Sequence, residues 1–119
     1  MRKKILVIDD DPYICELVSL ALKTKGHDVM TAMTGEKGIV AVNEFSPDIV
    51  LLDHRLPDLS GKDVAERLKK TEAGKKACII MMSGEDAQPE DLISGLYAGQ
   101  LKKPFKLSDM VDYIEKRLK

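Results

Sequence analysis

The chain has 119 residues, 44% of them hydrophobic and 33% charged, a composition typical of one globular domain spanning residues 1–119. Nineteen basic and twenty acidic side chains leave a formal net charge of -1, which gives no electrostatic footprint for nucleic acid. No apolar run reaches the roughly 20 residues of a membrane span, and the first residues lack the apolar core of a signal peptide. We therefore expect a cytoplasmic protein without direct contact to nucleic acid or membrane.

Short apolar runs alternate along the chain with longer amphipathic stretches. Regular alternation of this kind favours buried parallel strands, each followed by a helix. The runs cover residues 5–8, 29–33, 49–52 and 78–82, with a weaker one around Leu101. The first predicted helix starts at Pro12, with Asp11 as its N-cap, and stops at Gly26. Further helices are predicted over residues 35–45, 60–70 and 108–118. Between the last two, Pro89 opens a predicted fourth helix that includes Leu92, Ile93, Leu96 and Tyr97.

Five strand-helix units of this kind predict an α/β fold. Buried parallel strands need helices on both faces of the sheet and right-handed crossovers between strands. The second run ends in Met33 and Thr34 without a charged residue, which suits an edge strand. We predict a flavodoxin-like (βα)5 three-layer sandwich, with a five-stranded parallel sheet of order 2-1-3-4-5.

Polar side chains follow four of the five predicted strands. The carboxyl ends of parallel strands meet along one edge of the sheet, where open α/β sheets bind ligands. In the order 2-1-3-4-5, the switch point between strands one and three brings Asp9 and Asp10 beside Asp53. The other strand ends carry Ser83 with Gly84, and Lys103 with Pro104.

Three neighbouring carboxylates repel one another strongly. Two unit charges about 4 Å apart repel by roughly 4 kcal/mol at an effective dielectric near 20. Lys103 supplies one compensating charge, and Mg²⁺, which prefers carboxylates, waters and phosphate oxygens, supplies the rest. A phosphoryl group is the ligand that completes such a set, and a positioned carboxylate is then a candidate nucleophile for phosphoryl transfer.

The cysteines and histidines do not suggest a further site. Cys15 and Cys78 lie inside apolar periodic segments, which predicts buried thiols rather than a disulfide or a zinc site. His27 and His54 lack partners at metal-ligand or catalytic spacing, and we expect both to be structural or exposed. Asp58 and Gly61 are interpreted as loop and turn residues that follow the site.

The sequence resembles the receiver (CheY-like) domains of two-component response regulators over nearly its whole length. The motifs that carry the resemblance are Lys4 to Asp11, Pro47 to Asp53, Leu56 to Gly61, Ile79 to Gly84, and Lys103-Pro104-Phe105. The resemblance implies that Asp53 accepts a phosphoryl group from a histidine kinase or a histidine phosphotransfer protein. It further implies that Mg²⁺ is held by Asp10, Asp53 and the backbone carbonyl of Arg55, with Asp9 acting through a water; Mn²⁺ is expected to substitute.

The same resemblance assigns roles around the phosphoryl group. Ser83 is expected to turn its hydroxyl toward it, Lys103 to neutralise another oxygen, and Gly84 to keep the approach open. A cis bond is implied between Lys103 and Pro104, which X-Pro bonds permit at about 0.5 to 1 kcal/mol. Arg55 and Glu85 flank the group, and we expect this pair to tune the lifetime of the acyl phosphate.

One position departs from the family pattern. Receiver domains usually have an aromatic switch residue three positions before the conserved lysine, where this chain has Gln100. Tyr97 is the candidate substitute. The resemblance implies an output surface made by the predicted fourth helix, the strand near Leu101 and the last helix, and either a monomer or a weak phosphorylation-dependent dimer.

Three other functions remain as alternatives. A haloacid-dehalogenase-type phosphohydrolase shares a strand that ends Asp-x-Asp, here Asp9 to Asp11, with Ser83 and Lys103 as later partners, but it leaves Asp53 without a role. A flavin-binding module needs a glycine- or hydroxyl-rich phosphate loop after strand one, where this chain has three acids. A receiver-like interaction module that is not phosphorylated is suggested by Gln100. A receiver domain is itself expected to be a signalling domain rather than a turnover enzyme.

Overall fold

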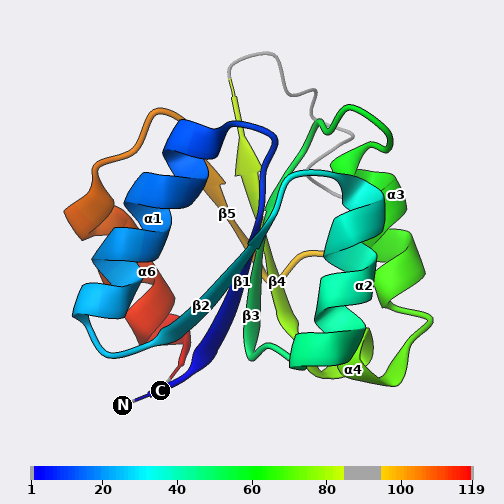
Figure 1. Ribbon diagram of the computed structural model, residues 1–119, viewed down its shortest axis with the longest axis horizontal. Helices are drawn as coiled ribbons and strands as arrows, with labels where there is room; N and C mark the ends of the chain where they lie inside the picture. The colour runs from blue at the N-terminus through cyan, green and yellow to red at the C-terminus, as the bar shows by residue number, and fades with distance from the viewer. Residues whose placement is uncertain (1, 85–94, 119) are drawn as a thin grey trace.

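The computed structural model describes residues 2–84 and 95–118, which form a parallel sheet with helices on both faces (Figure 1). The sheet has five strands in the order β2-β1-β3-β4-β5, which confirms the predicted flavodoxin-like topology. Neighbouring strands are parallel throughout. The strands are β1 (Lys4–Ile8), β2 (Asp28–Ala32), β3 (Ile49–Asp53), β4 (Cys78–Ser83) and β5 (Gly99–Lys102).

Helices form the two outer layers. One face of the sheet is covered by α1 (Pro12–Thr24) and α6 (Leu107–Arg117), and the other by α2 (Gly35–Phe45), α3 (Gly61–Leu68) and α4 (Glu72–Lys76) (Figure 1). Asp11 caps α1 by accepting a hydrogen bond from the Tyr13 backbone N–H at 2.9 Å, as predicted. None of the helices described here is long and apolar enough to cross a membrane.

Burial differs sharply between the central and edge strands. All five residues of β3 are buried, because β1 and β4 pair with it on both sides and helices cover both faces. In β2, which pairs with β1 alone among the described strands, Met30 and Thr31 are exposed. The apolar core is therefore split by the central strands into one cluster under α1 and α6 and a second under α2 and α3.

A short helix after α3 was not predicted. Thr71 begins α4 by accepting a hydrogen bond from the Gly74 backbone N–H at 3.0 Å. A Cβ at Gly74 would overlap the Leu68 carbonyl, so glycine permits the chain to fold back tightly onto the end of α3. The helix has five residues, which is too few to show an amphipathic repeat in the sequence. The capping threonine is therefore the one local indication of this helix.

The predicted fourth helix is wrong over Leu96 and Tyr97. Both residues lie in irregular backbone between Gly95, whose φ is +76°, and the start of β5. The Ala98 backbone N–H donates to the Ile79 carbonyl at 2.8 Å, so this segment already pairs with β4 instead of forming helical bonds. Pro89, Leu92 and Ile93 lie outside the described residues.

Candidate functional site

Three carboxylates lie together at the carboxyl end of the central strands. Asp9 follows β1 and Asp53 ends β3, and these two strands are neighbours in the sheet. One oxygen from each of Asp9, Asp10 and Asp53 lies within 4.8 Å of the others. The strand order thus brings together residues that are 44 positions apart in the sequence, at the switch point of the sheet.

Asp9 is fully buried and is held from two sides. Its Oδ1 accepts a hydrogen bond from the Asp11 backbone N–H at 3.0 Å, and its Oδ2 accepts one from Lys103 Nζ at 2.7 Å. The turn that caps α1 therefore also orients this carboxylate. A buried carboxylate needs such partners, because an uncompensated charge in the interior is very costly.

Lys103 compensates part of the negative charge of the cluster. Its ammonium nitrogen lies 2.7 Å from Asp9 Oδ2 and 3.4 Å from Asp53 Oδ1. Burial disfavours its charged form, but the hydrogen bond to Asp9 and the charges of Asp53 and Asp9 together outweigh burial and raise the Lys103 pKa. Lys103 is therefore a cation at neutral pH.

Asp53 is unusually basic for a carboxylate. Its burial, followed by the negative charge of Asp9, raises the pKa of Asp53 to about 6, against an ordinary value of 3.8. Lys103 and His54 act in the opposite direction, and His54 Nδ1 lies 3.7 Å from Asp53 Oδ1. One lysine therefore leaves the cluster short of positive charge, which is the electrostatic condition for binding a cation.

The donor set fits a hard divalent cation such as Mg²⁺. All three clustered side chains offer carboxylate oxygens, which such ions prefer, and Asp10 is exposed on the open side. An adjoining pocket of about 400 Å³ leaves room for further ligands. It is lined by Asp10, Asp53, His54, Arg55, Leu56, Pro57, Gly84 and Lys103.

The other predicted residues surround this pocket unevenly. Gly84 and Arg55 line it, whereas Ser83 is buried at the end of β4. The Ser83 carbonyl accepts a hydrogen bond from the Lys103 backbone N–H at 2.7 Å, which places the serine next to the lysine. The Lys103-Pro104 peptide bond is cis. Glu85 lies outside the described residues.

Three residues near the site have roles that the sequence analysis missed. His54 lines the pocket beside Asp53. Gly61 donates its backbone N–H to the His54 carbonyl at 2.8 Å, and a Cβ there would lie 2.5 Å from the Asp53 carbonyl oxygen. Asp58 accepts hydrogen bonds from the backbone N–H groups of Gly35 and Glu36, which cap α2 and lower the Asp58 pKa. Nothing in local spacing signals the last contact, because it spans 23 residues.

Gln100 lies on the exposed side of β5. Its side chain is exposed, and its backbone N–H donates to the Tyr113 hydroxyl of α6 at 2.9 Å. Tyr97 is half-buried and packs against the core cluster under α2 and α3. The two residues therefore lie in different environments, although they are only three positions apart.

Fold and site together define a class: doubly wound α/β domains with a carboxylate cluster and a lysine at the switch point. A family model described as the response regulator receiver domain matches residues 5–115. The chain therefore belongs to the response regulator receiver domain family, whose members act in phosphorelay signal transduction. This result confirms the predicted family and favours none of the three alternatives.

Curated relatives agree with this assignment. The chain is 39% identical over 110 residues to the probable transcriptional regulatory protein TcrX of Mycobacterium tuberculosis, a match that covers 90% of this chain and 46% of TcrX. It is 35% identical over 122 residues to the DNA-binding response regulator MtrA of Mycolicibacterium smegmatis, which covers 100% of this chain and 52% of MtrA. The chain thus spans about half the length of these relatives.

Solved structures share the fold. A CheY-like response regulator receiver domain protein from Methanospirillum hungatei superposes with a TM-score of 0.88 at 27% identity, over 99% of this chain and 94% of that one. The receiver domain of sensor histidine kinase PA1611 from Pseudomonas aeruginosa, solved with magnesium in its active site cleft, gives 0.86 at 22% identity, over 98% and 97% of the two chains. The second comparison bears on fold alone.

Proposed function

We propose that Asp53 is the phosphoacceptor of this receiver domain. A carboxylate oxygen of Asp53 attacks the phosphorus of a phosphohistidine on a histidine kinase or a histidine phosphotransfer protein. The O–P bond forms as the N–P bond breaks, the imidazole leaves as a neutral ring that keeps the proton of its other nitrogen, and an acyl phosphate remains on Asp53. The observation that carries this proposal is the placement of Asp53, which ends a buried strand, opens into the pocket and lies 3.4 Å from Lys103 Nζ.

Neighbouring side chains prepare Asp53 for this role. Asp10, Asp53 and the Arg55 backbone carbonyl would hold Mg²⁺, with Asp9 behind them, and Mn²⁺ would substitute. When bound, the cation supplies positive charge that offsets the carboxylates and the incoming phosphoryl oxygens. Asp53, whose pKa is raised by burial and by the charge of Asp9, would be favoured in its ionised form by that positive charge. Lys103, already between Asp9 and Asp53, is placed to neutralise a second phosphoryl oxygen.

We propose that Ser83 detects the phosphoryl group and that Gly84, which lines the pocket, keeps the approach to it open. Ser83 is buried behind the pocket and is joined to Lys103 through the backbone, so a reorientation of its hydroxyl would be transmitted to β5. We propose that Tyr97 and Gln100, which lie between β4 and the end of β5, pass this change on to the output surface. That surface consists of β5, α6 and the segment before β5. The phosphoryl group can shift the equilibrium between the inactive and the active conformation by no more than the difference in free energy with which these contacts stabilise the two conformations.

We propose a signalling role with one phosphoryl group per chain rather than multiple turnover on free phosphate esters. MtrA is named as a DNA-binding response regulator. The formal net charge of -1 on these 119 residues offers little attraction to a phosphate backbone. We therefore assign them contacts with a kinase or phosphotransfer protein and with an output partner, and no direct contact with DNA.

Intact-mass measurement tests the proposal. The protein is incubated with acetyl phosphate or phosphoramidate, with and without Mg²⁺, alongside Asp53→Ala and a control, Asp48→Ala, at an exposed aspartate before β3. We expect a gain of one phosphoryl group that requires Mg²⁺, persists in Asp48→Ala and is lost in Asp53→Ala. Folded wild-type protein that binds Mg²⁺ but gains no mass, even with a phosphorylated histidine phosphotransfer protein, would contradict the proposal.

A further inference from the structure

Strand β2 is one of the two edge strands of the sheet. Within the described residues, β2 pairs with β1 on one side and with no strand on the other. The Asp28 N–H donates to the Lys3 carbonyl and the Ala32 carbonyl accepts from the Asp9 N–H, so Asp28, Met30 and Ala32 direct their backbone groups toward β1. By the alternation of a parallel ladder, Val29 and Thr31 direct their N–H and C=O groups away from the sheet. Such an edge is a template for another strand.

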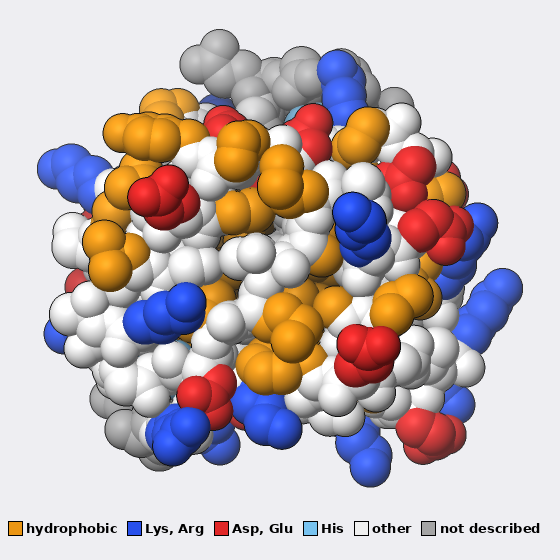
Figure 2. Space-filling model, in the orientation of Figure 1, with side chains coloured by type: hydrophobic (Ala, Val, Ile, Leu, Met, Phe, Trp, Pro, Cys, Tyr) orange, Lys and Arg blue, Asp and Glu red, His pale blue; other side chains and the backbone are white. Residues whose placement is uncertain are grey.

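Exposed apolar side chains gather around this edge. Among the described residues, every exposed large hydrophobic side chain belongs to α1, to α2, to β2 or to the residue that follows β2. Figure 2 shows hydrophobic groups over the middle of this face, interspersed with single charged side chains. The side chains are Tyr13, Leu20, Met30, Met33 and Val40.

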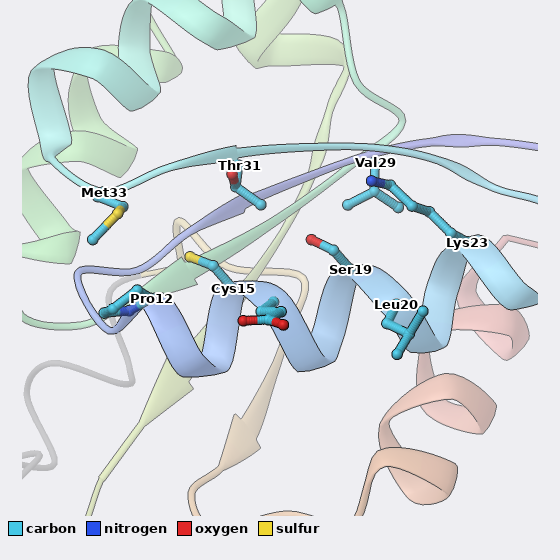
Figure 3. Close-up of a pocket in the computed structure, with 9 residues that line it drawn as sticks. Pro12, Cys15, Ser19, Leu20, Lys23, Val29, Thr31 and Met33 are labelled. Carbon is cyan, nitrogen blue, oxygen red and sulfur yellow. The ribbon is translucent and has the colours of Figure 1, made fainter.

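A groove of about 490 Å³ lies between α1 and β2 (Figure 3). Ser19, only 8% exposed, points from α1 toward β2, and its hydroxyl has no hydrogen-bond partner within residues 2–84 and 95–118. In Figure 3 it lies opposite the interval between Val29 and Thr31 of β2. Ser19 therefore lies across the groove from the middle of β2.

On each of the two helices beside the edge, two side chains of opposite charge flank an exposed apolar side chain. On α1, exposed Glu16 and Lys23 are seven positions apart and flank Ser19 and Leu20. On α2, exposed Lys37 and Glu44 are also seven positions apart and flank Val40. A two-fold rotation that sets each helix antiparallel to its own copy places the positive end of one against the negative end of the other. The surface is thus electrostatically complementary to itself.

We propose that two copies of this chain associate edge to edge, by antiparallel pairing of β2 with β2 of the second copy about a two-fold axis at Met30. Val29 then lies opposite Thr31 of the second copy, and their outward backbone groups exchange hydrogen bonds. Met30 meets Met30 on one face of the joined sheet, and Leu20 meets Leu20 on the other. Glu16 faces Lys23 of the second copy, and the pair occurs twice.

This association is separate from the proposed phosphorylation. β2 and β5 are opposite edges of the sheet, so the joined sheet leaves β5 and α6 exposed for an output partner. The carboxylate cluster lies at the carboxyl ends of β1 and β3 and takes no part in the pairing. The dimer is therefore expected with and without Mg²⁺ or a phosphoryl donor.

Sedimentation equilibrium of the 119-residue chain, at concentrations up to about 1 mM, tests the proposal. The variants are Glu16→Lys, Lys23→Glu and the double exchange, all at exposed positions. We expect each single change to raise the dimer dissociation constant about tenfold, since a repulsive pair occurs twice, and the double exchange to return it within about twofold of wild type. Thr31→Pro, which removes an outward N–H at an edge position, should also abolish association.

Circular dichroism establishes that each variant is folded, and Lys62→Glu, on α3 away from the edge, is the charge-matched control. A wild-type chain that stays monomeric over the whole concentration range overturns the proposal. A dimer whose dissociation constant is unchanged by the single charge reversals, or is not restored by the double exchange, overturns it equally.

Discussion

Lys103 Nζ donates a hydrogen bond to Asp9 Oδ2 at 2.7 Å, across 94 positions of sequence. The contact joins the residue that follows β1 to the residue that follows β5. These two strands are not neighbours in the sheet. It pairs a fully buried carboxylate with a partly buried ammonium group. The ion pair therefore compensates the buried charge of Asp9 and holds the ammonium group of Lys103 beside Asp53.

Replacing Lys103 by methionine should destabilise the metal-free protein. The change leaves Asp9 buried without its cation, and breaking a buried pair from one side costs about 3 kcal/mol. Urea denaturation at pH 7 measures this free energy of unfolding. Lys102→Met, at the neighbouring exposed position, should change it by less than about 0.5 kcal/mol. Equal effects of the two changes would contradict the role given to the ion pair.

Asp53→Asn should stabilise the metal-free protein, and more so at higher pH. Folded Asp53 has a pKa of about 6 against 3.8 ordinarily, so the folded state binds its proton more tightly than the unfolded chain does. Its contribution to stability is complete below about pH 4 and is lost as pH rises through about 6.

At pH 7.5 we expect Asp53→Asn to raise the free energy of unfolding by about 1 kcal/mol, a value reduced for solvent screening, and at pH 4 to have little effect. Urea denaturation at the two pH values measures the difference, and added Mg²⁺ should narrow it. A gain that is larger at pH 4 than at pH 7.5 would contradict the raised pKa.

Gly61→Ala should weaken both the fold and the site. A Cβ at this position would lie 2.5 Å from the Asp53 carbonyl oxygen and 2.8 Å from His54 Cα, and backbone atoms cannot yield as a flexible side chain does. Overpacking of this kind costs about 1 to 3 kcal/mol. Thermal unfolding and the rate of phosphoryl uptake report the two effects. Lys62→Ala, one residue later and exposed, is the control, and equal behaviour of the two variants would contradict this role for Gly61.

Cys15 should react slowly with alkylating reagents in the folded protein. Burial, and then the charges of Asp9 and Asp11, raise the pKa of its thiol to about 11. At pH 8 the thiolate fraction is about a hundredfold lower than at the ordinary pKa of 9.0, and the thiolate is the reactive form. Labelling of the Cys78→Ser variant with iodoacetamide, followed by mass spectrometry, measures the rate at which Cys15 reacts. Labelling as fast as in denaturant would contradict the prediction.

Arg55→Ala should shorten the lifetime of the phosphoryl group proposed on Asp53. Arg55 lines the pocket, and we predict that with Glu85 it restricts the approach of water. A contribution of up to about 1 kcal/mol from such a surface pair corresponds to dephosphorylation up to about fivefold faster. Loss of phosphoryl mass over time gives the rate, with Arg67→Ala as the control. An unchanged rate in Arg55→Ala and in Glu85→Ala would contradict the prediction.

Periodicity predicted the buried parallel strands, because such strands are nearly continuous apolar runs. The strand order came from the flavodoxin-like pattern, which an uncharged second strand end suits, and in that order the strand ends bring Asp9, Asp10, Asp53 and Lys103 to one edge of the sheet. The N-cap at Asp11 was also predictable, since capping depends on residues within one turn.

Only the tertiary structure determined the contacts between distant segments. The capping of α2 by Asp58, the close approach of Gly61 to Asp53, and the placing of His54 beside the carboxylates all depend on how loops fold against one another. The failure at Leu96 and Tyr97 has the same origin. Their apolar pattern suits a helix, yet pairing of Ala98 with β4 commits the backbone to the sheet. Local preference amounts to less than about 1 kcal/mol per residue, and tertiary hydrogen bonding and burial override it.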